Sequence, residues 1–364
     1  MPMTTPEIVR QRLPSLASRS ATLGFDGFID SVIKVIRNKD GEHSTYFEST
    51  QEFGKYITEK GEKNFSIELE ELTTKIGGNV PITANALAHL GTQVSCIGSL
   101  GYPDIHPAFR QMPSNCRLYS FANPGASNVL EFKTGKIMLA EMKSLNSIPW
   151  ELIRNTIGTK TIVDLFNQSD LVALLNWSEL DNSTSVWKGL IADIMPKLNA
   201  KKNQIGFFDL SDCSRRSESS IQEAMDLLKT FSTYWNVVLS LNLNEAHIVH
   251  SVLSKKPSKE ESIERLCEDI YEKLGIGMVA IHNSKQAVAK SSRGFYSKKS
   301  FPVENPVIST GAGDNFNAGF AAGMLMDLDV DIALMIGHAT SSVYMLSGKS
   351  PGNKQLLEFI SHNS

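Results

Sequence analysis

The stretch with the clearest chemistry covers residues 308–320, ISTGAGDNFNAGF. An aspartate, Asp314, follows a turn of small residues whose backbone is open to a ligand, namely Gly311, Ala312 and Gly313. Apolar residues at helical spacing after Asp314 predict that a helix begins here. The first N–H groups of a helix have no internal partner and attract negative charge, and an aspartate can take a proton from a hydroxyl. The stretch therefore predicts transfer of a phosphoryl group to an alcohol.

The same stretch also fits a structural role, because glycine-rich helix starts allow close packing and an aspartate is common in a first turn. Its sequence, TGAGDNF followed by AGF, resembles the C-terminal signature of the ribokinase/PfkB family of carbohydrate kinases. The resemblance implies that Asp314 is the catalytic base and that residues 311–313 form an anion hole. It also implies that Thr310, at the start of the loop, contacts the nucleotide.

Two aspartates near the N-terminus are candidates for binding the acceptor. Asp26 and Asp30 follow Gly24 at the C-terminal side of a predicted first parallel strand, where ligands of open α/β sheets collect. In the family, an aspartate at a similar place binds sugar hydroxyls. Asp30 fits this position best, because an apolar strand resumes after it. Asp26 remains an alternative, and it also fits the start of a turn with Gly27.

A glycine pair is the second marker of the family. Gly77, Gly78 and Asn79 precede a predicted helix of small residues. This segment resembles the N-terminal signature of the family, in which the glycine pair and the polar residues after it contact the sugar. Ile82 stands where the family usually has an asparagine, so we expect the sugar contacts to be rearranged.

The third marker follows a largely apolar run at residues 237–241. Asn242 and Glu245 resemble the Asn-x-x-Glu motif with which the family organises Mg²⁺ near the nucleotide phosphates, and Mg²⁺ prefers oxygen ligands. Alternatively, Asn244 caps a helix and Glu245 is an acidic residue of its first turn. By the same resemblance, His282 and Ser284 follow a later strand at the position of a nucleotide contact, although a histidine there also suits a structural role.

The elements that position these residues form an α/β pattern. From residue 151 onward, predicted helices alternate with short apolar strands, which favours a parallel sheet covered on both faces. The resemblance implies a ribokinase-like three-layer α/β/α fold with a mainly parallel sheet, formed as a single domain by residues 1–364. Residues 32–75 and about 117–142 are expected to form a small β lid over the sugar. In the family this lid often serves as a homodimer contact.

Composition narrows the class of protein further. The 364 residues carry a formal net charge of −3, so nothing indicates binding to nucleic acid or to an acidic membrane. The four cysteines lie far apart without a Cys-x-x-Cys pair, which argues against a zinc site or a disulfide framework. No signal peptide or membrane-spanning apolar run of ~20 residues is recognisable. We therefore expect a cytoplasmic protein.

The combined prediction is an ATP-dependent, Mg²⁺-requiring kinase that phosphorylates a hydroxyl, expected to be primary, of a sugar or sugar-like molecule. One alternative is a nucleoside kinase of the same family, with Phe25, Phe28 and Phe121 as an apolar wall. Another is a sugar- or nucleotide-binding regulator without turnover. The intact Asp314 disfavours the regulator, because a protein that only binds has no need of a base.

The residue at position 308 leads to a prediction about cation dependence. The family usually has an aspartate here that helps to form a monovalent-cation site. Because Ile308 offers no side-chain oxygen, we predict a strict need for Mg²⁺ or Mn²⁺ and little stimulation by K⁺. The measurement is a titration of the kinase rate with K⁺ against Na⁺ or Tris. Strong activation by K⁺ would mean that backbone carbonyl groups alone build such a site.

Overall fold

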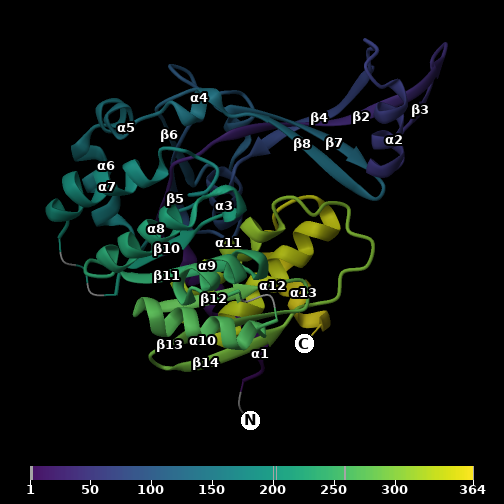
Figure 1. Cartoon of the computed structure of the whole chain (residues 1–364). Coiled ribbons are helices and arrows are strands. Elements are labelled where there is room, and N and C mark those ends of the chain that lie inside the picture. The colour runs from purple at the N-terminus through teal and green to yellow at the C-terminus, as the bar shows by residue number, and fades with distance from the viewer. Residues whose placement is uncertain (1–2, 200, 202, 258–259, 364) are drawn as a thin grey trace.

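The computed structural model describes residues 3–199, 201, 203–257 and 260–363. A nine-stranded sheet with the order β14-β13-β12-β11-β10-β9-β1-β5-β6 forms its centre (Figure 1). The first seven of these strands along the chain are parallel, and the last two form an antiparallel hairpin at one edge. The strands are β1 (Ser20–Gly24), β5 (Gln93–Gly98), β6 (Cys116–Ser120), β9 (Leu171–Leu174), β10 (Ile205–Asp209), β11 (Asn236–Asn242), β12 (Met278–His282), β13 (Gln286–Ser291) and β14 (Gly294–Lys299).

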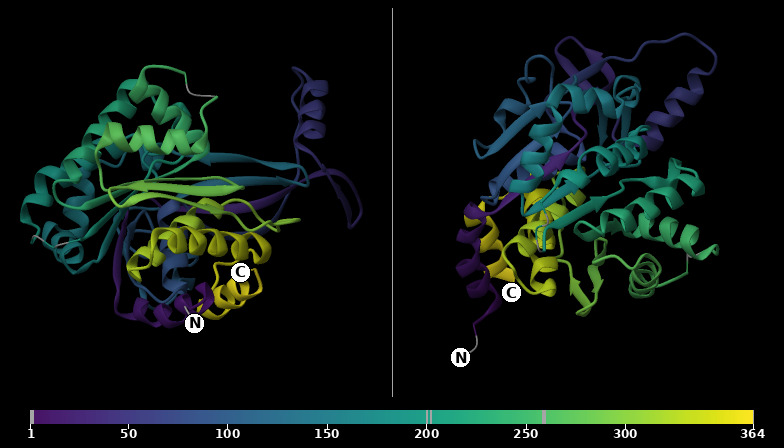
Figure 2. Two further views of the ribbon diagram at one scale, coloured as in Figure 1. Left: turned by 90° about the horizontal axis from the view of Figure 1, so that it is seen from below. Right: turned by 90° about the vertical axis from the view of Figure 1, so that its left-hand side faces the viewer.

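Helices cover both faces of this sheet (Figure 2). One face packs against α1 (Thr5–Arg12), α3 (Asn79–His89), α11 (Ala312–Leu325), α12 (Val330–Ser347) and α13 (Asn353–Asn363). The other packs against α5 (Trp150–Ile157), α6 (Thr159–Gln168), α7 (Ser183–Asp193), α8 (Glu218–Phe231), α9 (Leu243–Ser254) and α10 (Ile263–Leu274).

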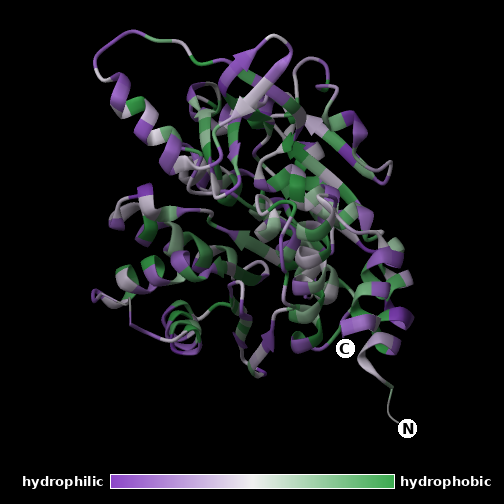
Figure 3. Cartoon of the chain, turned by 90° about the vertical axis from the view of Figure 1, so that its right-hand side faces the viewer, coloured by the Kyte–Doolittle hydropathy of each residue, from purple (hydrophilic) through white to green (hydrophobic). Residues whose placement is uncertain are grey.

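Strand β9 shows why the sequence forms three layers. Its side chains point alternately to the two faces: Leu171 and Ala173 join one hydrophobic cluster, whereas Val172 and Leu174 join the other. Both faces are therefore apolar, and hydrophobic residues are concentrated in the central strands (Figure 3). The predicted three-layer α/β/α fold with a mainly parallel sheet is confirmed. Within the described residues, no helix has the length and apolar character that crossing a membrane requires.

A second, smaller sheet projects from the body as a lid (upper right in Figure 1). It contains β2 (Phe28–Asp40), β3 (His43–Tyr46), β4 (Leu69–Gly77), β7 (Gly125–Phe132) and β8 (Gly135–Glu141), with helix α2 (Thr50–Lys60) packed on it. The predicted second lid segment, about residues 117–142, began too early. Strand β6 pairs with β5 in the large sheet, and alternation alone does not reveal which strand is the partner.

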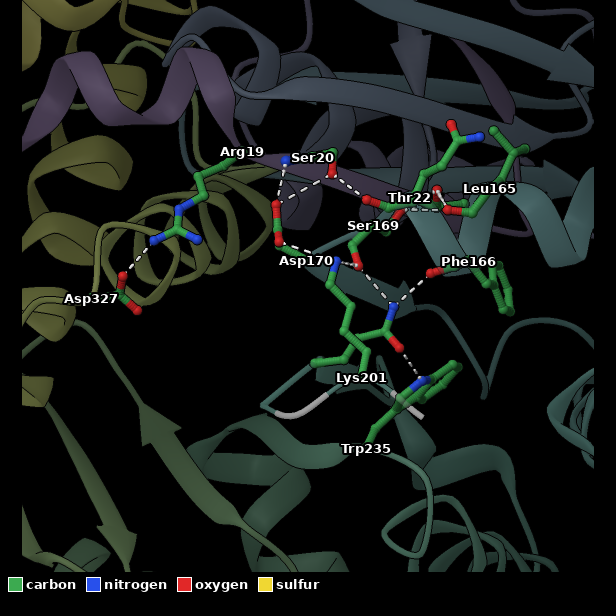
Figure 4. A network of polar contacts seen from close by, with 12 residues as sticks. Arg19, Ser20, Thr22, Leu165, Phe166, Ser169, Asp170, Lys201, Trp235 and Asp327 are labelled. Carbon is green, nitrogen blue, oxygen red and sulfur yellow. Dashed lines mark hydrogen bonds and ion pairs between the residues drawn. The ribbon is translucent and has the colours of Figure 1, made fainter. Parts of the chain in front are cut away.

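A polar network ties the starts of the central strands together, at the end of the sheet away from the predicted site (Figure 4). The backbone N–H of Ser20 donates to Asp170 (3.0 Å), which also pairs with Lys201 (3.2 Å). Gln204 donates to the carbonyl of Phe166 (2.6 Å) and accepts from the indole of Trp235 (3.0 Å). These bonds join β1, β9, β10 and β11 across the sheet.

At the opposite end, the fully buried Asp26 connects three elements. Its carboxylate accepts hydrogen bonds from the backbone N–H groups of Asn79 (3.0 Å) and Val80 (2.9 Å) at the start of α3. It also accepts one from the side-chain amide of Asn176 (2.5 Å), which follows β9. Gly78 has a φ of +88°, and a Cβ there would lie 3.1 Å from the carboxylate. Asp26 therefore caps α3 and binds β1 to the end of β9.

This geometry predicts different stability effects for two nearby aspartates. Replacing Asp26 by alanine leaves three donors without an acceptor, so we expect the free energy of unfolding to fall by about 3 kcal/mol or more. For a chain of this length the corresponding fall in Tm is roughly 4 °C or more. Asp30→Ala is the matched control, because no described residue donates a hydrogen bond to the Asp30 carboxylate. Thermal unfolding measures both, and an equal loss of Tm in the two variants would contradict the prediction.

Candidate active site

The glycine-rich loop ends at the first residue of α11, as the sequence predicted. Gly311 is the N-cap and has a left-handed conformation with φ +87°. A Cβ at this position would lie 2.9 Å from the hydroxyl oxygen of Tyr344. Because left-handed backbone favours glycine and no side chain fits here, position 311 requires glycine.

The loop leaves several backbone N–H groups available. In the described part of the chain, the N–H groups of Gly311, Gly313 and Asp314 make no backbone hydrogen bond. Ala312 was predicted to be part of the anion hole, but its N–H group is already used, because it donates to the carbonyl of Ser309 (3.2 Å). The free donors at this helix start can therefore hold an anion, with Asp314 N–H rather than Ala312 N–H as the third.

The side chain of Asp314 lies beside these donors. Its Oδ1 atom is shielded from solvent and has no hydrogen-bond partner among the described residues. Burial raises the pKa of this carboxyl well above its usual range, and further increases come from nearby negative charges, those of Asp209, Asp26, Glu245 and Asp30. A carboxylate with an unused, desolvated oxygen is well suited to accept a proton.

A cavity of about 740 Å³ lies between the lid and the body, with Asp314 in its wall. Of the residues predicted to bind substrate, Asp30, Gly78 and Asn79 line it, whereas Asp26 does not. Gly77 does not line the cavity, but its lack of a side chain makes room for Asp30, since a Cβ at Gly77 would lie 2.4 Å from Oδ1 of Asp30. The two glycines thus leave room for one aspartate each: Gly77 for Asp30 and Gly78 for Asp26.

Two further polar residues of this cavity were not among the predicted contacts. Ser127 on β7 and Asn176 after β9 are each 2% exposed, and both line the cavity. The Ser127 hydroxyl and the Asn176 Oδ1 atom have no partner in the described structure. Asn176 follows the end of a predicted strand, and this position could have indicated a site residue. Ser127 has no such signal, because only the pairing of β2 with β7 places it opposite Asp30.

The aromatic wall that we proposed for a nucleoside is only partly present. Phe28 lines the large cavity. Phe25 and Phe121 instead belong to the hydrophobic core and face a separate cavity of about 30 Å³. The remaining apolar wall of the large cavity comes from Ile82 and from lid residues such as Met138.

A smaller cavity of about 180 Å³ adjoins the first one and is acidic. Asp314 borders both cavities, and the smaller one is also lined by Asp209, Asp212, Asn242 and Glu245. Burial, followed by the charge of Asp209, raises the pKa of Glu245 well above its usual range. Such a site attracts a cation, but no three described His, Cys, Asp or Glu side chains are arranged to bind a metal unaided. Waters and phosphate oxygens would have to complete the coordination of Mg²⁺.

Asn242 and Glu245 also have a structural role here. Asn242 is the N-cap of α9: its side chain accepts from the N–H of Glu245 (3.0 Å), and the Glu245 carboxylate accepts from the N–H of Asn242 (2.9 Å). The capping alternative is therefore present, with Asn242 rather than Asn244 as the cap. This capping box holds both side chains at the wall of the acidic cavity.

A third cavity, of about 530 Å³, lies on the other side of the acidic one and includes His282, Ser284 and Gly313. The ring of His282 stacks on Phe316 with centroids 4.3 Å apart. Burial lowers the pKa of His282 to about 3 and that of His338, also in this wall, to about 4. Both rings are therefore neutral near pH 7. Thr310, predicted to contact the nucleotide, lines the large cavity instead.

Comparisons with known proteins fit this arrangement. A family model described as prokaryotic ketohexokinase matches residues 4–363. The ketohexokinase of Haloferax volcanii is 25% identical over 357 residues, which cover 97% of this chain and 94% of that protein.

Solved structures share the fold at low sequence identity. A putative ribokinase II from E. coli in complex with ATP and Mg²⁺ has a TM-score of 0.62 and 14% identity, covering 94% of this chain and 99% of that one. Adenosine kinase from Sinorhizobium meliloti has a TM-score of 0.66 and 14% identity, covering 95% and 99%. Since the family match extends over nearly the whole chain, this protein belongs to the prokaryotic ketohexokinase family and is an ATP-dependent carbohydrate kinase of the ribokinase/PfkB type.

Proposed function

We propose that the protein transfers the terminal phosphoryl group of ATP to a primary hydroxyl of a ketohexose. The observation that carries the proposal is the position of Asp314, whose unpartnered oxygen stands where the large cavity meets the acidic one. The family match supports a ketohexose as the acceptor. In this proposal the sugar occupies the large cavity and the nucleotide occupies the third.

On the sugar side, Asp30 is the main acceptor of hydrogen bonds from hydroxyl groups. It is 4% exposed and lines the cavity, so a bound sugar would supply the hydrogen bonds that the protein does not. The Ser127 hydroxyl and the Asn176 amide oxygen add two more unpaired groups. Buried polar groups are normally paired, and their convergence here supports a ligand with several hydroxyl groups.

On the phosphate side, Asp314 takes the proton of the attacking hydroxyl. The N–H groups of Gly311 and Gly313 stabilise the charge on the transferring phosphoryl group. Mg²⁺, held through Asn242 and Glu245 and through waters, would neutralise the phosphates of the nucleotide. The adenine base would lie in the third cavity near the neutral His282, with Ser284 at its edge.

We also propose that two copies associate through the lid. Two large apolar side chains on lid strand β4, Leu69 and Leu72, are at least 44% exposed and do not line the large cavity. Exposed apolar surface of this kind often marks an interface. A cytoplasmic location is supported by the four cysteines, all of which are free and buried, as expected in a reducing compartment.

A panel of acceptors tests the function. Purified protein with ATP and Mg²⁺ is assayed against fructose and other ketohexoses, aldoses and nucleosides, and binding is measured in parallel by thermal shift. We expect turnover with a ketohexose, and for Asp314→Asn a loss of about 10²–10⁴-fold in kcat with ATP binding retained. Turnover of nucleosides alone, or binding of sugars without turnover, would contradict the proposal.

The Asp314→Asn variant should also show how much the charged Asp314 carboxylate lowers the thermal stability of the ligand-free protein. Because its folded-state pKa is raised, the Asp314 carboxyl adds stability at pH values below its ordinary pKa and loses it as pH rises. Asp314→Asn removes this loss, so we expect its Tm to exceed that of the ligand-free wild type at pH 8, and to exceed it by less at pH 5. Asp104→Asn, at an exposed aspartate, is the control. A Tm difference that does not grow with pH would contradict the prediction.

A further inference from the structure

Tyr344 on α12 is a buried titratable residue that the mechanism above does not use. Its ring lies against the glycine-rich loop, and its hydroxyl donates a hydrogen bond to the carbonyl oxygen of Thr310 at 2.8 Å. The hydroxyl would be 2.9 Å from a Cβ at Gly311, and the side chain of Ile82 would be 3.5 Å from the same position. The loop is thus enclosed between Tyr344 and Ile82.

The hydrogen bond to Thr310 determines which way the next N–H group points. The peptide unit is planar and trans, so its C=O and N–H groups point in opposite directions. Because the Thr310 carbonyl is held toward α12, the N–H of Gly311 in the same peptide points away from α12. This is one of the N–H groups that have no backbone partner in the described chain.

Other groups of α12 hold the neighbouring peptides. The Ser341 hydroxyl donates to the carbonyl of Ala312 (2.9 Å), which orients the N–H of Gly313 in the same way. The carbonyl of Met345 accepts from the N–H groups of Val307 (2.8 Å) and Ile308 (3.3 Å). Among the described residues, Tyr344 is the side chain that fixes the peptide between Thr310 and Gly311.

We propose that the Tyr344 hydroxyl is a positioning residue for phosphoryl transfer: its hydrogen bond to Thr310 keeps the Gly311 N–H directed at the transferring group. This inference rests on the proposed role of the loop as an anion hole. Burial, with smaller effects from Asp314 and Asp30, raises the pKa of Tyr344 well above its ordinary value. The hydroxyl therefore keeps its proton and remains a donor throughout the neutral pH range.

Tyr344→Phe tests the proposal, because it removes the hydroxyl and keeps the ring. We expect kcat to fall about 10- to 100-fold, somewhat less than the full loss of one anion-hole donor, with KM for ATP and sugar changed less than about twofold. In addition, calorimetry should show weaker binding of ADP with aluminium fluoride, which mimics the transferring group, and unchanged binding of ADP alone. Tyr271→Phe, at a half-buried tyrosine on α10, is the matched control. It should change neither kcat nor the binding of ADP with aluminium fluoride.

Two outcomes would overturn the role of Tyr344. One is a kcat within about twofold of the wild type. The other is an equal loss of binding for ADP and for ADP with aluminium fluoride, which indicates general damage rather than misorientation of the loop. If the wild type phosphorylates no ketohexose, the proposed substrate is wrong, but the comparison of the two nucleotide complexes still tests Tyr344.

Discussion

The arrangement of the site depends on one buried carboxylate that does not line the large cavity. Asp26 follows β1, accepts from the first two N–H groups of α3 and holds the amide of Asn176 after β9. These bonds hold Asn176, whose Oδ1 atom has no partner among the described residues, and the start of α3 at the wall of the large cavity. Because these donors come from two distant segments, the start of α3 and the residues after β9, this one side chain brings together two segments that line the large cavity.

The cost of this arrangement is a concentration of negative charge. Asp314, Asp209 and Glu245 border the acidic cavity, and burial raises the pKa of each carboxyl. The negative charge of Asp209 raises the pKa of Asp314 and of Glu245 further. A charged group removed from water is stable only when it is paired or hydrogen-bonded. Substrate hydroxyls and a cation can provide those partners, so the ligand-free protein is expected to be less stable than its complexes.

The glycine-rich loop, the strands and the two other family markers could be predicted from the sequence, because each leaves a local pattern. The glycine turn before Asp314 and the apolar runs of β9 to β12 are of this kind. The sequence favoured Asp30 over Asp26, but it could not show why Asp26 is enclosed, because that depends on the φ of Gly78 and the docking of α3. Ser127 reaches the site through strand pairing across about 100 residues of chain, and no pattern near it in the sequence reports that contact.

Contacts between distant segments also explain why the sequence did not point to Tyr344 and why β6 was wrongly assigned to the lid. Tyr344 looks like any apolar position of a long helix, and only its hydrogen bond to Thr310 distinguishes it. Residues 116–120 alternate as a lid strand would, but they pair with β5. Both features depend on which segments meet in space, whereas composition and periodicity describe each segment separately.

The length of β2 has a mechanical consequence. This one strand runs without interruption from Phe28 at the cavity to Asp40 in the outer part of the lid, and Asp30 is its third residue. Ser127 lies opposite Asp30 on the neighbouring strand β7. Because Asp30 and Ser127 lie on lid strands, a swing of the lid away from the body would carry both away from Asp314. In the proposed function, closing the lid over the cavity and bringing Asp30 to the sugar are therefore the same movement.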